Sequence, residues 1–217
     1  MKFKLSPSSL NLMKECSRCF WLDKHKVWKR PNGIFPSLPS GMDSILKVHF
    51  DNFRDKGELP PEIRDHHHTK GLKLFDEPEL LKSWRNNLKG IRWEDEDGNI
   101  LFGAVDNILI KGKKLIVLDY KTKGFAIKDE TEAGDYYQNQ LDFYNFLLRK
   151  NGYETEDYAF LIFYYPKHVN ETGEVIFENL LARREVNIKN AEKIFEEAIK
   201  LLNGKCPKES CDWCEGK

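Results

Sequence analysis

The sequence predicts an α/β fold in which a mixed sheet is flanked by helices, with a small helical cap clasped by cysteines from the two chain ends. After residue 90, apolar runs typical of strands alternate with stretches of helical periodicity. All five cysteines lie near the chain ends, so we expect the ends to meet. A chain of 217 residues that is 40% hydrophobic can bury one substantial core. We therefore expect a single domain over residues 1–217, with residues 1–30 and 204–217 as the cap.

Each element follows from local periodicity and turn residues. We expect helices over residues 7–24, 41–56, 79–86, 135–150 and 189–202. We expect strands over residues 91–95, 99–110, 115–120, 158–165 and 175–181. A loop rich in proline and glycine is expected over residues 31–40, and the run His66, His67 and His68 is expected in a surface loop after two prolines.

Two carboxylates and a lysine are expected at one edge of the hairpin over residues 99–120. Asp106 belongs to the first strand, whereas Asp119 and Lys121 end the second and share a face because side chains alternate. Hydrolysis of a phosphodiester uses a divalent cation to bind the phosphate and activate water, and hard cations prefer oxygen ligands. A lysine beside the cation can orient the water or offset developing charge. The pattern indicates a metal-dependent phosphodiesterase, although Asp-x-Lys alone also occurs by chance.

The next predicted helix carries Gln140 and Tyr144, four residues apart and therefore on one face. Taken by itself, Tyr144 belongs to an apolar stripe with Tyr137, Leu141 and Leu148, which is typical of a core-facing side.

The order of these motifs resembles the RecB-like branch of the PD-(D/E)xK nuclease superfamily, whose motifs are GxxD, (D/E)xK and QxxxY. The matching segments are Gly103–Asp106, Asp119–Lys121 and Gln140–Tyr144. The resemblance implies a restriction-endonuclease-like core and a catalytic site formed by Asp106, Asp119, Lys121, Gln140 and Tyr144.

The resemblance also implies that Mg²⁺ or Mn²⁺ is bound by Asp106, Asp119 and the backbone carbonyl of Tyr120, with Lys121 at the attacking water. Many RecB-like nucleases add a histidine four residues after a glycine on an N-terminal helix. Ile45 stands at that offset here, and His49, one helical turn later, is the candidate ligand; packing or solvent exposure is the alternative.

Cysteine spacing predicts a second metal centre. Cys16 and Cys19 form one Cys-x-x-Cys pair, and Cys211 and Cys214 form another after Cys206. Four thiolates in two such pairs suit zinc or an iron–sulfur cluster. The start of the chain lacks the apolar run of a signal peptide, so we expect the reducing cytoplasm, where disulfides are rare. Unligated buried or reactive thiols are the alternative.

The iron–sulfur interpretation rests on a further resemblance. A subset of RecB-like nucleases, including the exonucleases of CRISPR adaptation and the AddB subunit of a repair helicase–nuclease, holds a 4Fe–4S cluster with one cysteine before the core and three after it. Residues 6–22 resemble the N-terminal signature of this subset, with Cys16 at its cysteine, but Cys19 is extra and the C-terminal spacing differs. The favoured ligands are Cys16, Cys19, Cys211 and Cys214; a set with Cys206 in place of Cys19, and zinc in place of the cluster, stay open.

Formal net charge is zero, with 35 basic and 35 acidic residues, so any contact with nucleic acid must rest on local patches. The predicted contacts are Lys24, Lys26, Lys29, Arg30 and Lys123. Trp21, Trp28 and Phe35 beside them suit either stacking on unpaired bases or covering the metal centre. Apolar runs long enough to cross a membrane are missing from the sequence.

We therefore expect a Mg²⁺- or Mn²⁺-dependent deoxyribonuclease, an exonuclease acting on single-stranded DNA, with a structural 4Fe–4S cluster and with partners in DNA repair or CRISPR adaptation. One alternative is a non-catalytic, metal-clasped nucleic-acid-binding or adaptor module. The other is a structural zinc protein in which Asp-x-Lys is a coincidence.

Overall fold

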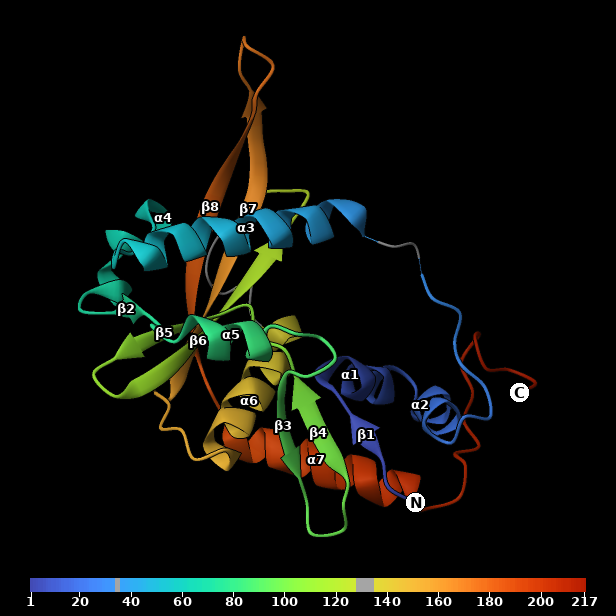
Figure 1. Ribbon diagram of the computed structural model, residues 1–217. Helices are drawn as coiled ribbons and strands as arrows, with labels where there is room; N and C mark the ends of the chain where they lie inside the picture. The colour runs from blue at the N-terminus through green and yellow to red at the C-terminus, as the bar shows by residue number, and fades with distance from the viewer. Residues whose placement is uncertain (34–35, 128–134) are drawn as a thin grey trace.

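The computed structural model describes residues 1–33, 36–127 and 135–217. Its larger sheet has five strands in the order β2-β5-β6-β7-β8 (Figure 1). These strands are β2 (Lys73–Leu74), β5 (Asn107–Lys111), β6 (Lys114–Thr122), β7 (Tyr158–Val169) and β8 (Val175–Glu185). β6 and β7 pair in parallel and the other neighbours pair antiparallel. The sheet is thus mixed, as predicted, and consistent with a restriction-endonuclease-like core.

Apolar residues on both faces explain why β6 and β7 lie at the centre. Ile116, Val117 and Leu118 in β6, and residues 159–163 in β7, are fully buried. Strands buried on both sides read as continuous apolar runs, and two parallel strands need a long crossover. Helix α6 (Asp135–Lys150) supplies that crossover.

The larger sheet separates two cores. One face meets α3 (Ser37–Asp55) through Leu46 and Phe50, which pack with Ile116 and Leu118. The opposite face meets α6 and α7 (Ile188–Leu202), where residues such as Val117 are buried. Since side chains alternate along a strand, Asp119 points to the α6 side and its neighbour Tyr120 to the α3 side.

A smaller sheet lies against α6 and α7. It has the order β1-β4-β3, with β1 (Lys4–Leu5), β3 (Ile91–Glu94) and β4 (Ile100–Gly103). Trp93 makes edge contacts with Phe146 of α6 and Phe195 of α7, at centroid distances of 5.2 and 5.3 Å. The sheet therefore fixes the position of β4, whose last residue is Gly103.

The strand predicted over residues 99–110 is wrong as one element. It divides into β4 and β5, which belong to different sheets, and the chain turns at residues 104–106. At this turn the backbone forms its hydrogen bonds with residues at the end of α5 (Pro78–Trp84) and not with a neighbouring strand. Val105 N–H donates to the Trp84 carbonyl, and Arg85 Nε donates to the Asp106 carbonyl at 2.7 Å.

The single helix predicted over residues 7–24 is also wrong. It divides into α1 (Pro7–Glu15) and α2 (Ser17–Lys24), with Cys16 extended between them at φ −158° and ψ 108°. Ser6 and Ser9 form a capping box at the start of α1. The break turns the thiol of Cys16 toward Cys214, at an Sγ–Sγ distance of 3.8 Å.

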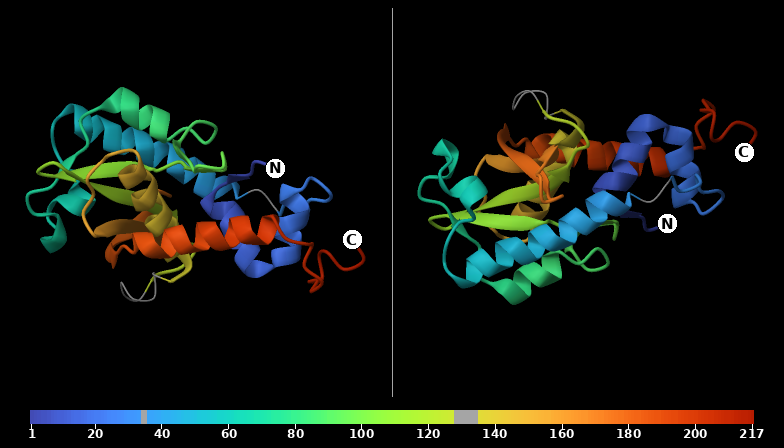
Figure 2. Two further views of the ribbon diagram at one scale, coloured as in Figure 1. Left: turned by 90° about the horizontal axis from the view of Figure 1, so that it is seen from below. Right: turned by 90° about the horizontal axis from the view of Figure 1, so that it is seen from above.

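The other elements lie close to their predicted places. The chain also has α4 (Pro61–Arg64) and a short 3₁₀ helix (His67–Thr69), so two histidines of the predicted loop lie in a helical turn. α3 begins four residues before the predicted helix, and the β7–β8 hairpin extends past the predicted strands and projects from the body (Figure 1). The first two helices and the C-terminal segment lie at the same end of the molecule (Figure 2). None of the helices in the described ranges is long and apolar enough to cross a membrane.

Candidate active site and cysteine cluster

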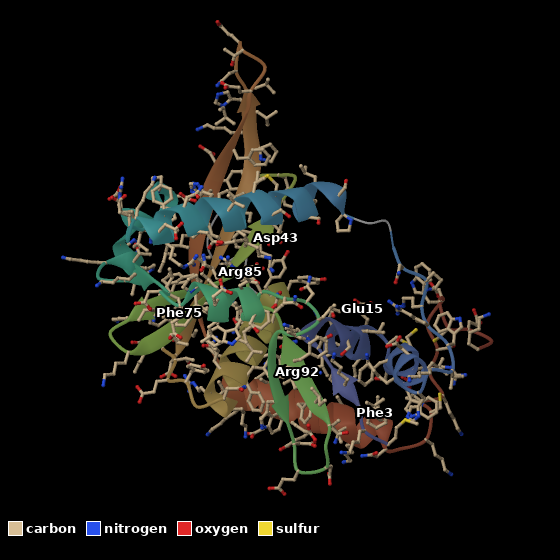
Figure 3. The ribbon with its side chains drawn as sticks, in the orientation of Figure 1. Phe3, Glu15, Asp43, Phe75, Arg85 and Arg92 are labelled. Atoms are coloured by element: carbon tan, nitrogen blue, oxygen red, sulfur yellow. The ribbon has the colours of Figure 1, made fainter. Side chains whose placement is uncertain are left out.

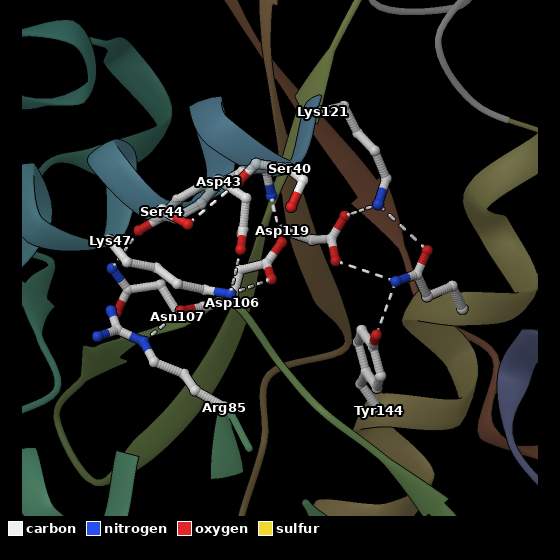
Figure 4. A network of polar contacts seen from close by, with 12 residues as sticks. Ser40, Asp43, Ser44, Lys47, Arg85, Asp106, Asn107, Asp119, Lys121 and Tyr144 are labelled. Atoms are coloured by element: carbon white, nitrogen blue, oxygen red, sulfur yellow. Dashed lines mark hydrogen bonds and ion pairs between the residues drawn. The ribbon is translucent and has the colours of Figure 1, made fainter. Parts of the chain in front are cut away.

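Asp106 and Asp119 bring their carboxyl groups together at the turn before β5 and in β6 (Figure 4). Asp119 is 1% exposed. Its Oδ1 accepts a hydrogen bond from Gln140 Nε2 at 3.1 Å, and its Oδ2 forms an ion pair with Lys121. Within the described residues, Oδ2 receives no hydrogen bond of regular geometry. A buried carboxylate oxygen is therefore left with capacity for another positive ligand.

The charge of the site agrees with this. Burial raises the pKa of Asp119 to about 7; the Lys121 ammonium opposes this rise and the Asp106 carboxylate adds to it. Burial by itself lowers the pKa of Lys121, but the two carboxylates outweigh it, so this pKa lies above its usual range. The Asp119 and Asp106 carboxyl groups thus face each other closely enough to raise the pKa of Asp119, and a bound cation would offset their repulsion.

Gln140 connects the other predicted residues. Its Oε1 accepts from Lys121 Nζ at 3.2 Å, and its Nε2 donates to the Tyr144 hydroxyl at 2.7 Å. Tyr144 is 5% exposed, and burial together with the charges of Asp119 and Asp106 raises its pKa well above the usual range. Tyr144 is thus both a buried aromatic of the core and a neutral member of the site.

Sequence reasoning missed two residues that α3 adds to the site. Lys47 Nζ lies 2.7 Å from Asp43 Oδ2 and 3.4 Å from Asp106 Oδ1. The signal was present: Asp43, Lys47 and Asp51 recur every four residues on a predicted helix, which places three charges on one face. Figure 3 shows Asp43 on α3, and Figure 4 shows Lys47 reaching Asp106 from that helix.

Arg85 was also missed, and it holds the Asp106 turn in place. Its NH1 contacts both oxygens of Asp51 at 2.9 and 2.7 Å, while its Nε binds the Asp106 carbonyl. Asp106 Oδ2 in turn accepts from the Tyr120 backbone N–H at 2.9 Å. Arg54 continues this support by donating to Asn107 Oδ1 at 2.6 Å.

His49 is not brought to the Asp106–Asp119 pair. It lies two residues after Lys47, about 200° around a helix with 3.6 residues per turn. Its Nε2 is 2.9 Å from Glu62 Oε1, and Glu62 also accepts from the Tyr164 hydroxyl at 2.8 Å. The geometry therefore supports the packing alternative for His49.

The donor groups at the centre fit a hard divalent cation. Two carboxylates meet, one buried oxygen lacks a regular hydrogen bond, and Asp43 adds a third carboxylate near Asp106. Such oxygen-rich sites suit Mg²⁺ or Mn²⁺. The backbone carbonyl of Tyr120 stays a predicted ligand.

The family model described as the PD-(D/E)XK nuclease superfamily matches residues 37–216. The chain belongs to this superfamily. Members are metal-dependent nucleases, which agrees with the donor groups above. The match contains Asp106, Asp119 and Lys121 but leaves residues 1–36, with Cys16 and Cys19, outside it.

Other comparisons add little to this assignment. The solved structure described as "Crystal structure of SSO0001" aligns with 96% of this superfamily member and 80% of its own chain, with 14% identity and a TM-score of 0.46. The search of curated proteins found no match.

Four of the five cysteines gather where the chain ends meet. The Sγ atoms of Cys16, Cys19, Cys211 and Cys214 all lie within 4.8 Å of one another, a grouping that could hold a metal ion. Two short contacts join the two Cys-x-x-Cys pairs: Cys19 Sγ lies 3.5 Å from Cys211 Sγ, and Cys16 Sγ lies 3.8 Å from Cys214 Sγ. Cys206 is not in this group, and its sulfur accepts from Arg18 at 3.7 Å.

Arg30, which we predicted to contact nucleic acid, faces these sulfurs. Its NH2 lies 3.5 Å from Cys19 Sγ and 3.6 Å from Cys211 Sγ, and its NH1 pairs with Glu15 at 2.7 Å. Burial raises the pKa of the Cys19 thiol to about 12, a rise that the hydrogen bond from Arg30 opposes. The thiol pKa of Cys211, by contrast, falls to about 6: burial opposes the fall, and hydrogen bonds from the Trp213 backbone and from Cys19 outweigh it. A guanidinium beside thiolates stabilises the charged form that binds metal.

The remaining predicted contacts divide between two places. Lys24 is half-buried and pairs with Asp23 at 3.2 Å, whereas Lys26 and Lys29 are exposed. Lys24 and Lys29 line a hollow of about 430 Å³ near the start of α1. Lys123 lies by the active site, with Nζ 5.2 Å from the centroid of the Tyr137 ring.

The aromatic residues near the first cysteines cover the cluster. Trp21 and Trp28 pack against buried Cys19 and Cys214, and Trp21 Nε1 donates to the Gly204 carbonyl at 3.2 Å. These contacts favour the covering role over base stacking for both tryptophans. Phe35 lies outside the described residues.

Proposed function

We propose that this superfamily member is a Mg²⁺- or Mn²⁺-dependent deoxyribonuclease that removes nucleotides from the ends of single-stranded DNA. The observation that carries the proposal is the single contact network formed by Asp106, Asp119, Lys121, Gln140 and Tyr144. These groups come from a turn, a strand and a helix, and the fold brings them to one point.

In this mechanism Asp106 and Asp119 hold the cation, with the Tyr120 carbonyl as a further ligand. When bound, a divalent cation binds the scissile phosphate and lowers the pKa of a water molecule. The water oxygen would form a bond to phosphorus and lose a proton to solvent, while the bond from phosphorus to the leaving sugar oxygen would break and that oxygen would take up a proton from solvent. Lys121, held by Gln140 and Asp119, orients the water and offsets the charge that develops on phosphorus.

Gln140 and Tyr144 position these groups. Because Gln140 contacts Asp119 and Lys121 at once, it fixes the distance between the Asp119 carboxylate and the Lys121 ammonium. Tyr144 anchors the amide of Gln140 from the side of the core. Both residues therefore belong to the site without exchanging protons with the substrate.

We further propose that the cysteine cluster holds a structural 4Fe–4S group through Cys16, Cys19, Cys211 and Cys214, with zinc as the alternative. Four thiolates around one point suit either group. The cluster would join residues 1–30 and 204–217 into a cap on one domain spanning residues 1–217. We place the enzyme in the cytoplasm, with DNA repair or CRISPR adaptation as its setting.

The proposal is tested with end-labelled single-stranded DNA, double-stranded DNA and RNA in Mg²⁺ or Mn²⁺, on anaerobically purified protein. We expect the wild type to shorten single-stranded DNA from an end, Lys121→Ala to lose this activity while keeping the circular dichroism spectrum of the folded protein, and Leu88→Ala, an exposed residue outside the network, to match the wild type. Equal cleavage by wild type and Lys121→Ala would overturn the assignment.

One observation favours a second candidate, a non-catalytic DNA-binding module. The Lys47 ammonium lies between Asp43 and Asp106, where it partly neutralises the carboxylates that would bind a cation. Wild-type protein that binds single-stranded DNA, takes up no Mg²⁺ or Mn²⁺ in calorimetry and leaves every substrate uncut would support this candidate.

A further inference from the structure

A chain of three hollows runs along α1 from the active site to the cysteine cluster. The first, of about 360 Å³, is lined by Gln140 and Tyr144 and by Asn11 of α1. The second, of about 240 Å³, shares Asn11 with the first and adds Tyr136. We call the three together the α1 groove.

The third hollow, of about 580 Å³, continues from the second. It shares Lys14 and Glu15 with it and reaches Cys16 and Cys211. Glu15 marks the end of α1 in Figure 3. Because neighbouring hollows share wall residues, the three lie side by side along α1 between the two centres of the molecule.

The walls of the groove suit bases more than phosphates. The first hollow is lined by neutral residues only, including Ser6, Ser8 and Asn87. In the second, the positive charge of Lys14 is matched by Glu15. Amide and hydroxyl groups hydrogen-bond to the edges of unpaired bases, whereas binding through phosphates depends on excess positive charge. The groove is thus built for a strand whose bases are turned toward the protein.

Tyr136 supplies the surface on which a base would stack. It lies in the first turn of α6, is 74% exposed, and its ring meets the edge of Tyr137 at a centroid distance of 5.0 Å. That contact supports the ring while most of its surface faces solvent. Stacking of a base on an exposed aromatic ring contributes to the binding of single strands whatever their sequence.

We propose that the α1 groove is the path of the single-stranded substrate, with one base stacked on Tyr136 on the way from the active site to the cysteine cap. The inference rests on the proposed nuclease function and specifies its substrate: an unpaired strand, since pairing occupies the Watson–Crick edge that Asn11 or Asn139 would contact and covers the base face that would stack on Tyr136. It also gives the cap a role, because a strand long enough to pass Tyr136 reaches Cys16 and Cys211.

The test measures binding, with turnover removed by a Lys121→Ala background. Oligonucleotides of roughly 4 and roughly 16 nucleotides, the range of strand lengths such grooves bind, carry a fluorescent adenine analogue that dims when it stacks. We expect Tyr136→Ala to weaken binding of the longer strand by about 5- to 100-fold and to abolish dimming. Tyr136→Trp, which keeps a stacking ring, should bind as the parent does.

Two comparisons make the result decisive. A strand that occupies only the first hollow should bind equally well with and without the Tyr136 ring, and Asn11→Trp, which fills the junction of the first two hollows, should weaken the longer strand as Tyr136→Ala does. Equal affinity of Tyr136→Ala and parent for both strands would overturn the proposal, and so would an equal loss for both.

This outcome is separable from that of the nuclease proposal. If the wild-type protein shortens DNA and Tyr136→Ala has no effect on binding at any strand length, the groove proposal is contradicted and the nuclease proposal stands. If binding depends on Tyr136 and on strand length but the wild-type protein cuts no substrate, the nuclease proposal is contradicted and the groove proposal stands.

Discussion

The ring of Tyr144 lies against the backbone of Gly103, so closely that a Cβ at residue 103 would stand 2.8 Å from Tyr144 Cε1. This contact joins the GxxD segment to the QxxxY helix. The Tyr144 hydroxyl accepts a hydrogen bond from the Gln140 side-chain amide, which also donates to Asp119. The absence of a side chain at Gly103 therefore sets the position of the Tyr144 ring and, through it, of the Gln140 amide.

Gly103→Ala should therefore displace Tyr144 and lower the rate of cleavage at least tenfold. Overpacking of this kind costs about 1–3 kcal/mol, which a domain of this size tolerates. Cleavage assays and thermal melts of Gly103→Ala and Gly41→Ala give the comparison, since a Cβ at Gly41 meets no atom within 4 Å. Full activity in Gly103→Ala would show that the Tyr144 contact does not position the site.

The raised pKa of Asp119 predicts an unusual pH dependence for protein dialysed free of Mg²⁺ and Mn²⁺. An unfolded aspartate titrates near 3.9, and the folded value is about 7. Folding thus favours the protonated form, and the stability this contributes is fully present below about pH 4 and lost as pH rises to about 7. The melting temperature of the wild type, relative to Asp119→Asn, should fall across this window. Parallel profiles would contradict the prediction.

Lys47 should oppose cation binding, because its ammonium lies 3.4 Å from Asp106 Oδ1. Lys47→Met removes the charge and keeps most of the chain length, so Mg²⁺ and Mn²⁺ should bind about two- to fivefold more tightly, the scale of a partly exposed ion pair. Asp43→Asn should weaken binding. Isothermal titration calorimetry measures both, and weaker cation binding by Lys47→Met would reverse the role assigned to this lysine.

Arg30 should strengthen metal binding by the cysteines. Its NH2 lies within 3.6 Å of Cys19 Sγ and Cys211 Sγ, so Arg30→Ala removes positive charge from two thiolates. We expect a faster loss of iron or zinc to a chelator, and a partial recovery in Arg30→Lys. Metal analysis and visible absorbance follow this loss; Lys26→Ala, an exposed neighbour, is the control and should match the wild type. Identical metal loss from Arg30→Ala and wild type would show that the guanidinium does not stabilise the centre.

Removal of the metal from the cysteines should loosen the chain ends and lower thermal stability. Binding to ligands that are absent from the unfolded chain adds its free energy to folding. Cys214→Ser should act like a chelator, whereas Cys206→Ser, outside the group of four, should keep metal content and melting temperature. A loss of metal in Cys206→Ser equal to that in Cys214→Ser would restore Cys206 as a ligand.

Local sequence was sufficient for the central elements. The continuous apolar runs that form β6 and β7 can be buried only as inner strands, and the helical stripe around Leu141 can only face a core. The five site residues, from Asp106 to Tyr144, were found because their order resembles a known superfamily and their local spacing carries the chemistry.

Prediction from local sequence was wrong at two places where contacts with distant residues interrupt a regular helix or strand. The strand over residues 99–110 breaks because Arg85 and Trp84 bind the backbone at Asp106 and Val105, and nothing local to the strand encodes that contact. The first helix breaks at Cys16, whose partner Cys214 lies 198 residues away.

The sequence by itself thus determined the types of the main elements, the candidate acids and lysine of the site and the two Cys-x-x-Cys pairs, because these depend on period, spacing and residue chemistry, whereas the structure chose Cys19 over Cys206 for the group of four. Only the tertiary structure decided that Lys47 and Asp43 join Asp106, that His49 turns to Glu62, that Arg30 faces sulfur and that three hollows lie side by side along α1. The physical reason is that the rotation of a helix about its axis, and the closeness of distant segments, are set by packing against the whole core.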